Sequence, residues 1–176
     1  MNRRAEILAV AEALLEAEGP DALTMRRVAE EMGIKAPSLY KHVANKDAIE
    51  AGLQERALRD LAEWLTPSGQ DLTALTRRYR EWALAHPGLY ELATRRPLRR
   101  DEIAPGVEAA AAAQVVAAVG GDEHRARALW AQAHGLVDLE LADRFPPGAD
   151  LDRTWAAAIA PYASQAAEVD RNRSET

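Results

Sequence analysis

Residues 24–46 read TMRRVAEEMGIKAPSLYKHVANK, the pattern of two short helices joined by a tight turn. Thr24 is a hydroxyl N-cap for the first helix, and Gly33 stands where helices often end in a left-handed residue. Pro37 suits the first position of the second helix, because its fixed φ is helical and its missing N–H is not needed there. The stretch therefore predicts a helix-turn-helix, whose second helix is the element that enters a major groove of DNA.

The second helix of this motif is expected to be short, with Leu39 and Val43 on its inner face. Ala36, its expected N-cap, has no side-chain oxygen, which leaves backbone N–H groups for a phosphate or for water. Asn45 is the expected N-cap of a third helix. The polar side chains of the second helix are thereby left on its outer faces.

The composition favours an all-α protein. Of the 176 residues, 48% are apolar but only 5% are aromatic, and alanine is the commonest residue, so helices are expected to approach closely. The absence of cysteine excludes disulfides and thiolate metal sites and fits a reducing compartment. We find no signal peptide and no uncharged apolar run of about 18 residues. The expected location is the cytoplasm, with no membrane segment.

The net charge of −6 is unusual for a protein that binds nucleic acid, but the charge is unevenly distributed. Residues 24–46 hold five basic residues against Glu30 and Glu31, a local charge of +3; the five are Arg26, Arg27, Lys35, Lys41 and Lys46. A histone-like, non-specific DNA binder would need far more positive charge. The distribution indicates an acidic body that carries one small basic face.

Helical periodicity extends along the rest of the chain. Helices are expected over 3–17, 46–64, 71–86, 88–94, 107–118, 123–144 and 150–169, with 123–144 the longest. The charged stretch 95–106 is expected to be a mobile loop. The chain is expected to divide into a helix-turn-helix head (1–46), a connecting helix (47–65), a helical body (66–169) and a disordered tail (170–176).

The head resembles a known family. LYKHV at 39–43, followed by NKD at 45–47, is similar to the L-Y-x-H-F…x-K-[ED]-x-L stretch of TetR/AcrR-type transcriptional regulators, and LTMRRVA at 23–29 matches their second helix. The resemblance covers the N-terminal third of the chain, and it is specific in combination. Val43 departs from the phenylalanine usual in the family, so the small core of the head should hold less aromatic bulk.

The C-terminal part also shows a resemblance. WALAHPGLY at 82–90 and WAQAHGL at 130–136 are similar to a TetR C-terminal subfamily named for a Trp…His-Gly pattern. The resemblance implies an all-helical, ligand-sensing body and a homodimer formed by the last two helices, here 123–144 and 150–169. It names no ligand and implies no cofactor.

The resemblance also implies contacts with DNA. Thr24, Tyr40 and Lys46, with Arg27, would hold phosphates, which set the register of a protein on DNA without reading its sequence. The exposed start and outer face of the second helix are expected to hold Lys35, Pro37, Ser38, Lys41 and His42. Of these, the candidates for base edges are Lys35, Ser38 and Lys41. The alternative is that the basic residues form a solvated face and that Tyr40 packs. Arg3 and Arg4 form either a DNA-contacting arm or a frayed terminus.

The candidate ligand-binding residues are the polar-edged aromatic side chains of the body: Trp82, His86, Tyr90, Trp130 and His134. Such groups suit a mostly apolar small-molecule site, although aromatic residues at helical spacing are also common in cores. A cation shared by His134 and Asp138 with another histidine is a minor alternative, and no metal site is expected. No nucleophile motif or phosphate loop indicates an enzyme.

The sequence thus predicts a ligand-responsive repressor that binds a pseudo-palindromic operator as a homodimer. One alternative is a helical ligand-binding or enzymatic domain whose head does not read DNA. Another is an architectural, partner-binding protein, which the compact basic head on an acidic chain disfavours.

Overall fold

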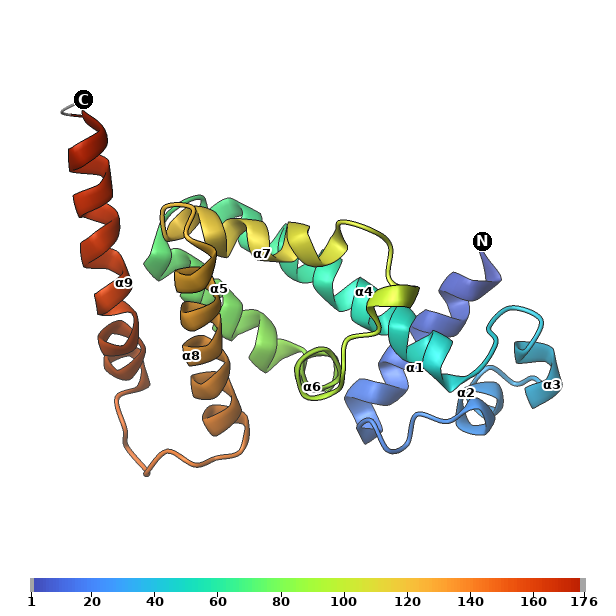
Figure 1. Ribbon diagram of the computed structural model, residues 1–176. Helices are drawn as coiled ribbons and strands as arrows, with labels where there is room; N and C mark the ends of the chain where they lie inside the picture. The colour runs from blue at the N-terminus through green and yellow to red at the C-terminus, as the bar shows by residue number, and fades with distance from the viewer. Residues whose placement is uncertain (1, 175–176) are drawn as a thin grey trace. The chain divides into compact units, whose positions relative to one another are not determined.

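The computed structural model describes residues 2–174 of the chain and the side chains of residues 2–163. Within residues 2–174 every regular element is a helix, which confirms the all-α class (Figure 1). The elements are α1 (Arg3–Glu18), α2 (Met25–Glu31), α3 (Ala36–Leu39), α4 (Lys46–Leu65), η1 (Thr66–Ser68), α5 (Leu72–Ala85), α6 (Pro87–Arg95), η2 (Arg100–Glu102), α7 (Val107–Ala118), α8 (Glu123–Leu141) and α9 (Leu151–Ser174).

The chain forms two compact units. The N-terminal unit comprises Met1–Asp60 and His86–Val107, and the C-terminal unit comprises Leu61–Ala85 and Glu108–Thr176. Each unit is therefore built from two separate segments of sequence, and α4 contributes residues to both. The division by function that the sequence predicts, with a head ending at residue 46, stays a prediction.

Helix α2 begins as the sequence predicts. The hydroxyl of Thr24 accepts a hydrogen bond from the backbone N–H of Arg27 (3.1 Å). Leu23 and Val28 are buried on either side of this cap, in the position of a hydrophobic staple. These contacts set the direction in which α2 leaves the preceding turn, and α2 packs on both α1 and α3 (Figure 1).

The turn of the helix-turn-helix is a left-handed helix cap. Gly33 has a φ of 65°, and its N–H donates to the carbonyl of Glu30 (3.0 Å). The N–H of Ile34 donates to the carbonyl of Ala29 (3.0 Å), which completes the paired bonds of a Schellman motif. A side chain at position 33 would be strained at this φ, so glycine is needed to turn the chain toward α3.

Helix α3 is shorter than predicted and begins one residue earlier. Its N-cap is Lys35, not Ala36, and no side chain caps it. Neither lysine nor alanine has a short side chain with an oxygen that could cap a helix, so the sequence does not indicate the residue at which α3 begins. The chain continues as a turn in which the N–H of Val43 donates to the carbonyl of Leu39 (3.0 Å). Leu39 and Val43 are both buried, as predicted.

Within the N-terminal unit, the start of α6 is docked on the end of α1. Both carboxylate oxygens of Glu16 accept backbone N–H bonds, from Gly88 (2.9 Å) and from Leu89 (2.9 Å). A negative charge at a helix N-terminus is favourable, because the free N–H groups there carry partial positive charge. Gly88 has no room for a side chain: a Cβ would lie 2.7 Å from the carbonyl oxygen of Leu15.

The stretch 95–106, expected to be a mobile loop, contains η2 and is tied to α4. Gln54 is 1% exposed, and its amide nitrogen donates to the carbonyls of Leu92 and Pro97 (3.2 Å each). Its amide oxygen accepts from the N–H of Arg99 (3.1 Å). Further along, the N–H of Ala104 donates to the carboxylate of Glu55 (3.2 Å). These bonds fix the path of the loop across α4.

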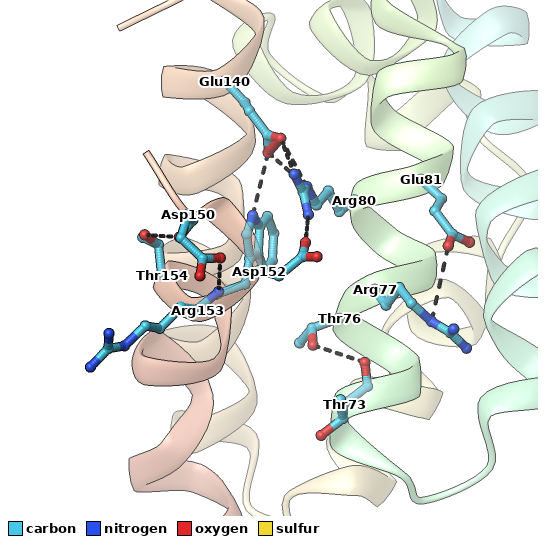
Figure 2. A network of polar contacts seen from close by, with 11 residues as sticks. Thr73, Thr76, Arg77, Arg80, Glu81, Glu140, Asp150, Asp152, Arg153 and Thr154 are labelled. Carbon is cyan, nitrogen blue, oxygen red and sulfur yellow. Dashed lines mark hydrogen bonds and ion pairs between the residues drawn. The ribbon is translucent and has the colours of Figure 1, made fainter. Parts of the chain in front are cut away.

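In the C-terminal unit, α5, α8 and α9 pack on one another and share a polar centre. Figure 2 shows Arg80 of α5 between Glu140 of α8 and Asp152 of α9. The Arg80 Nε lies 2.8 and 2.9 Å from the two Glu140 oxygens, and its Nη1 lies 2.8 Å from Asp152 Oδ1. The indole N–H of Trp155 also donates to Glu140 (3.3 Å). Hydrogen bonding to Glu140, above all, raises the pKa of Arg80 despite its burial.

The last two helices differ from the prediction in length. Helix α8 ends at Leu141, not at residue 144, because Asp143 adopts a left-handed φ of 51° that stops it. Helix α9 has 24 residues and is longer than α8, which was predicted to be the longest. Its backbone is helical through Ser174. Residues 175 and 176 lie outside the described residues.

Candidate nucleic-acid interface and sensor residues

The residues predicted to contact DNA lie in α2, α3, the turn after α3 and the start of α4, all in the N-terminal unit. Because Leu39 and Val43 point into the core, the side chains between them are turned outward. Tyr40 is 55% exposed, so it is not a packing residue of the isolated chain. The exposed members of the set are Thr24, Lys35, Pro37, Tyr40, Lys41 and His42, and the half-buried members are Arg27, Ser38 and Lys46.

The basic residues of this face differ in their partners. Within the described part of the chain, no carboxylate pairs with Lys35 or Lys41, so both ammonium groups are available to an anionic ligand. Arg27, by contrast, is held by Glu18 (2.6 Å) and Glu31 (2.8 Å). Hydrogen bonds to Glu18 and then Glu31 raise the pKa of Arg27. These two carboxylates already neutralise the charge of Arg27, so it is a weaker candidate for a phosphate contact than Lys35 or Lys41.

Arg3 and Arg4 lie within the first turn of α1, whose N-cap is Asn2. The side chain of Arg3 pairs with Glu6 (2.7 Å). The two arginines are therefore helical residues and do not form an extended arm in front of α1. They do not form a frayed terminus either, because the backbone is helical from Arg3 onward.

Lys46 stands at the start of α4 beside a buried acid. Its Nζ lies 3.5 Å from Glu50 Oε1, and the side chain of Glu50 is only 5% exposed. The second oxygen of Glu50 accepts from Arg99 Nη2 (3.1 Å), which also pairs with Asp47 (2.7 Å). Burial opposes the charged form of Arg99, but Glu50 and Asp47 together raise its pKa. Neither Glu50 nor Arg99 is among the site residues predicted from the sequence.

The predicted ligand-binding residues do not share one environment. Trp82 and Tyr90 are buried, at 3% and 1% exposed, and such burial fits core packing as well as a ligand site. His86 is half-buried at the N-cap of α6. Trp130 is 46% exposed and stacks on His134, with 5.8 Å between ring centroids. Trp82, Trp130 and His134 belong to the C-terminal unit, whereas His86 and Tyr90 belong to the N-terminal unit.

Helix α8 carries three large apolar side chains that are exposed. Its buried residues are Ala126, Leu129, Ala133 and Val137, which lie along one side. Trp130, Leu139 and Leu141 are exposed on other sides of the helix. A Cβ at Gly135 would meet nothing within 4 Å, so this glycine does not mark a close helix crossing within the chain.

Nowhere among the described residues do three or more histidine or acidic side chains gather closely enough to hold a metal ion. The same residues include no helix with the length and apolar character that crossing a membrane requires.

Comparison with known families assigns the class of the protein. The sequence model of the family described as "Bacterial regulatory proteins, tetR family" matches residues 7–53, which contain the helix-turn-helix. The model described as "Tetracyclin repressor-like, C-terminal domain" matches residues 72–162, more than half of the chain. The chain belongs to the tetR family of bacterial regulatory proteins, and it is a DNA-binding transcriptional regulator.

Individual relatives agree with this class. The uncharacterized HTH-type transcriptional regulator Rv0681 of Mycobacterium tuberculosis is 32% identical over 154 residues, which are 78% of this chain and 70% of the relative. A protein of unknown function from Rhodococcus sp. RHA1 is 26% identical, with a TM-score of 0.72 over 92% of this chain and 94% of its own. BioQ with its double-stranded DNA operator shares the fold at 19% identity, with a TM-score of 0.59 over 91% and 97% of the two chains.

Proposed function

We propose that this regulator is a repressor that binds a pseudo-palindromic operator as a homodimer and releases it when a small molecule binds. The proposal rests on one observation: Lys35, Tyr40 and Lys41 are exposed on a helix-turn-helix whose apolar residues are buried. Two such heads would read successive major grooves, with half-sites about one helical turn, ~34 Å, apart. BioQ, which shares the fold, has been crystallised with its double-stranded DNA operator, and this supports operator binding as the function.

The proposed contacts divide into two kinds. Thr24, Tyr40 and Lys46 would hold phosphates, which position the head on the duplex. The base-edge candidates Lys35, Ser38 and Lys41 lie at the start of α3 and just after it, with Pro37 and His42 beside them. Arg27 is a secondary phosphate candidate, because Glu18 and Glu31 already engage it.

The small molecule would act on the conformation of the chain. To lower operator affinity, it must bind the DNA-free conformation better than the DNA-bound one, typically by about 1–3 kcal/mol. Trp82, His86, Tyr90, Trp130 and His134 remain the candidate contacts. The proposal requires no cofactor, no metal and no catalysis, and it places the protein in the cytoplasm with the DNA that it regulates.

The test of this function is retardation in a gel of the promoter fragment next to the protein's own gene. We expect a saturable shift that excess unrelated DNA does not abolish, and loss of the shift when the effector is added. Turnover of a small molecule by protein that shifts no promoter fragment would instead favour a helical enzyme without operator binding.

Lys46→Ala is expected to weaken binding to every DNA sequence and to reduce its salt dependence. Each phosphate contact contributes about 0.9 to the slope of log affinity against log salt, so loss of Lys46 lowers that slope by about 0.9 per subunit. Tyr40→Phe should weaken binding with little change of slope, because it removes a neutral donor. Titrations at several salt concentrations measure both effects. The control is Arg59→Ala, which removes an exposed cation already paired with Glu55 (2.9 Å) and should leave the salt slope unchanged. An unchanged salt slope for Lys46→Ala would show that Lys46 does not contact a phosphate.

The homodimer is proposed to form through α8 and α9, the helices of the predicted ranges 123–144 and 150–169. Helical spacing places the exposed Trp130 and Leu141 on the same side of α8, and they are the apolar residues that such an interface would cover. We expect Trp130→Glu to convert the dimer to a monomer in light-scattering mass measurements at micromolar concentration. Leu84→Glu, an equally drastic change at a 39% exposed leucine of α5, should leave the dimer intact. A monomeric wild-type protein that still binds palindromic DNA would contradict the proposal.

A further inference from the structure

We propose that Arg99 is a positioning residue for the phosphate contact of Lys46, and that it acts through Glu50. The inference rests on the proposed contact of Lys46 with DNA. It makes DNA binding depend on a residue of the loop that follows α6, 49 residues from Glu50 in sequence.

Glu50 is a carboxylate that must be compensated. Its side chain is 5% exposed, and a buried charge is costly unless a counter-charge and hydrogen bonds offset its lost hydration. Two cations contact it, one at each oxygen: Lys46 at Oε1 and Arg99 at Oε2. Among the described residues no other cation pairs with Glu50. The two cations therefore share the compensation of one buried charge.

The two contacts are unequal. Arg99 Nη2 lies 3.1 Å from Glu50 and makes a hydrogen bond, whereas Lys46 Nζ lies 3.5 Å away in a looser ion pair. The Arg99 side chain is also held by Asp47, and its backbone N–H is held by Gln54 (3.1 Å). Lys46 can therefore turn toward a phosphate while Arg99 continues to compensate Glu50.

Without Arg99, Lys46 is no longer free to leave Glu50. Lys46 would be the one cation left on Glu50, so its departure to a phosphate would leave a buried carboxylate uncompensated. The local charge would also change: Lys46, Asp47, Glu50 and Arg99 sum to zero, and without the arginine they sum to −1 beside the backbone of the DNA. Both effects weaken the phosphate contact without touching Lys46 itself.

The experiment compares Arg99→Ala with Arg96→Ala in the full-length protein. Both variants remove one arginine from the same loop, but Arg96 pairs with the fully exposed Asp21 (3.6 Å) and does not contact Glu50. Affinity for the operator fragment is measured at several salt concentrations. We expect Arg99→Ala to weaken binding roughly 3- to 10-fold and to lower the salt slope by up to about 0.9 per subunit, as Lys46→Ala does. Arg96→Ala should leave both quantities close to wild type.

Rescue variants distinguish positioning from a loss of folding. Glu50→Gln in the Arg99→Ala background removes the charge that retains Lys46, so this double variant should recover the wild-type salt slope. Arg99→Lys keeps a cation beside Glu50 and should therefore keep most of the wild-type salt slope. Lys46→Ala added to Arg99→Ala should cause little further loss, because both act on one contact. The slope reports only molecules that bind, so a smaller folded fraction does not alter it.

Three outcomes overturn parts of the proposal. If Arg99→Ala weakens binding but the slope stays at the wild-type value while Lys46→Ala lowers it, Arg99 has a structural role only and the inference fails alone. Fully additive losses for Lys46→Ala and Arg99→Ala also overturn it. An unchanged slope for Lys46→Ala overturns the phosphate contact itself, and the inference with it.

Discussion

Gly88→Ala is expected to lower the free energy of unfolding by about 3 kcal/mol, the upper end of the usual cost of overpacking. A Cβ at position 88 would lie 2.7 Å from the carbonyl oxygen of Leu15 and 2.9 Å from its carbonyl carbon. Both atoms are backbone, so they cannot turn aside as the tip of a side chain can. The start of α6 must move away from α1, and the two N–H bonds to Glu16 are then strained or lost.

Gly52→Ala provides the matched comparison. A Cβ there also meets an atom at 2.8 Å, but that atom is a terminal methyl of Leu8, which can change rotamer. Alanine is also favoured over glycine inside a helix by about 1 kcal/mol, which offsets the crowding. Urea unfolding at one fixed protein concentration measures both variants. A Gly88→Ala protein as stable as Gly52→Ala would show that α6 does not depend on this close approach.

Glu140→Ala is expected to cost about 3 kcal/mol of stability, because removing one partner of a buried ion pair leaves the other charge uncompensated. The carboxylate of Glu140 is 10% exposed, and it accepts hydrogen bonds from Arg80 and from the indole of Trp155. Among the described residues, Arg80, whose side chain is 20% exposed, would keep only the exposed Asp152 as an acidic partner. The three helices α5, α8 and α9 meet at this carboxylate, so the loss affects the packing of all three.

Asp152→Ala tests whether burial is the cause. Asp152 lies 2.8 Å from the same guanidinium but is 93% exposed, and exposed ion pairs contribute less than about 1 kcal/mol. Denaturant titrations of the two variants, again at one protein concentration, should therefore differ by about 2 kcal/mol. Equal losses would indicate that Arg80 responds to the total charge around it and not to the buried hydrogen bonds.

The features that could be predicted from sequence are those whose physical cause lies within a few residues. Thr24 caps α2, Asn45 caps α4 and Asp122 caps α8, each by accepting N–H bonds from the next turn. Gly33 ends α2 because its left-handed backbone depends on its own missing Cβ. The inward positions of Leu39 and Val43 follow from helical spacing alone. These signals suffice for the helix-turn-helix and for most helix boundaries.

The features that were missed join residues far apart in sequence. The spacing of Lys46 and Glu50 indicates a possible pair, but nothing in the chain places Arg99 beside them. The pair of Arg80 and Glu140, 60 residues apart, is equally invisible before folding. Periodicity also shows that α8 is apolar on several sides, but it cannot distinguish a core from a partner, so the exposure of Trp130 was not predicted.

The discontinuous build of the N-terminal unit limits how its DNA specificity can be transplanted. A chimaera that takes only the first 60 residues would lack the amides of Gly88 and Leu89 that bind Glu16. It would also lack the carbonyl of Leu92 that accepts from the buried Gln54. Each unsatisfied buried polar group costs about 1–3 kcal/mol. A functional graft must therefore carry His86–Val107 as well. The N-terminal unit can be transferred to another regulator only as two segments of sequence, not as one.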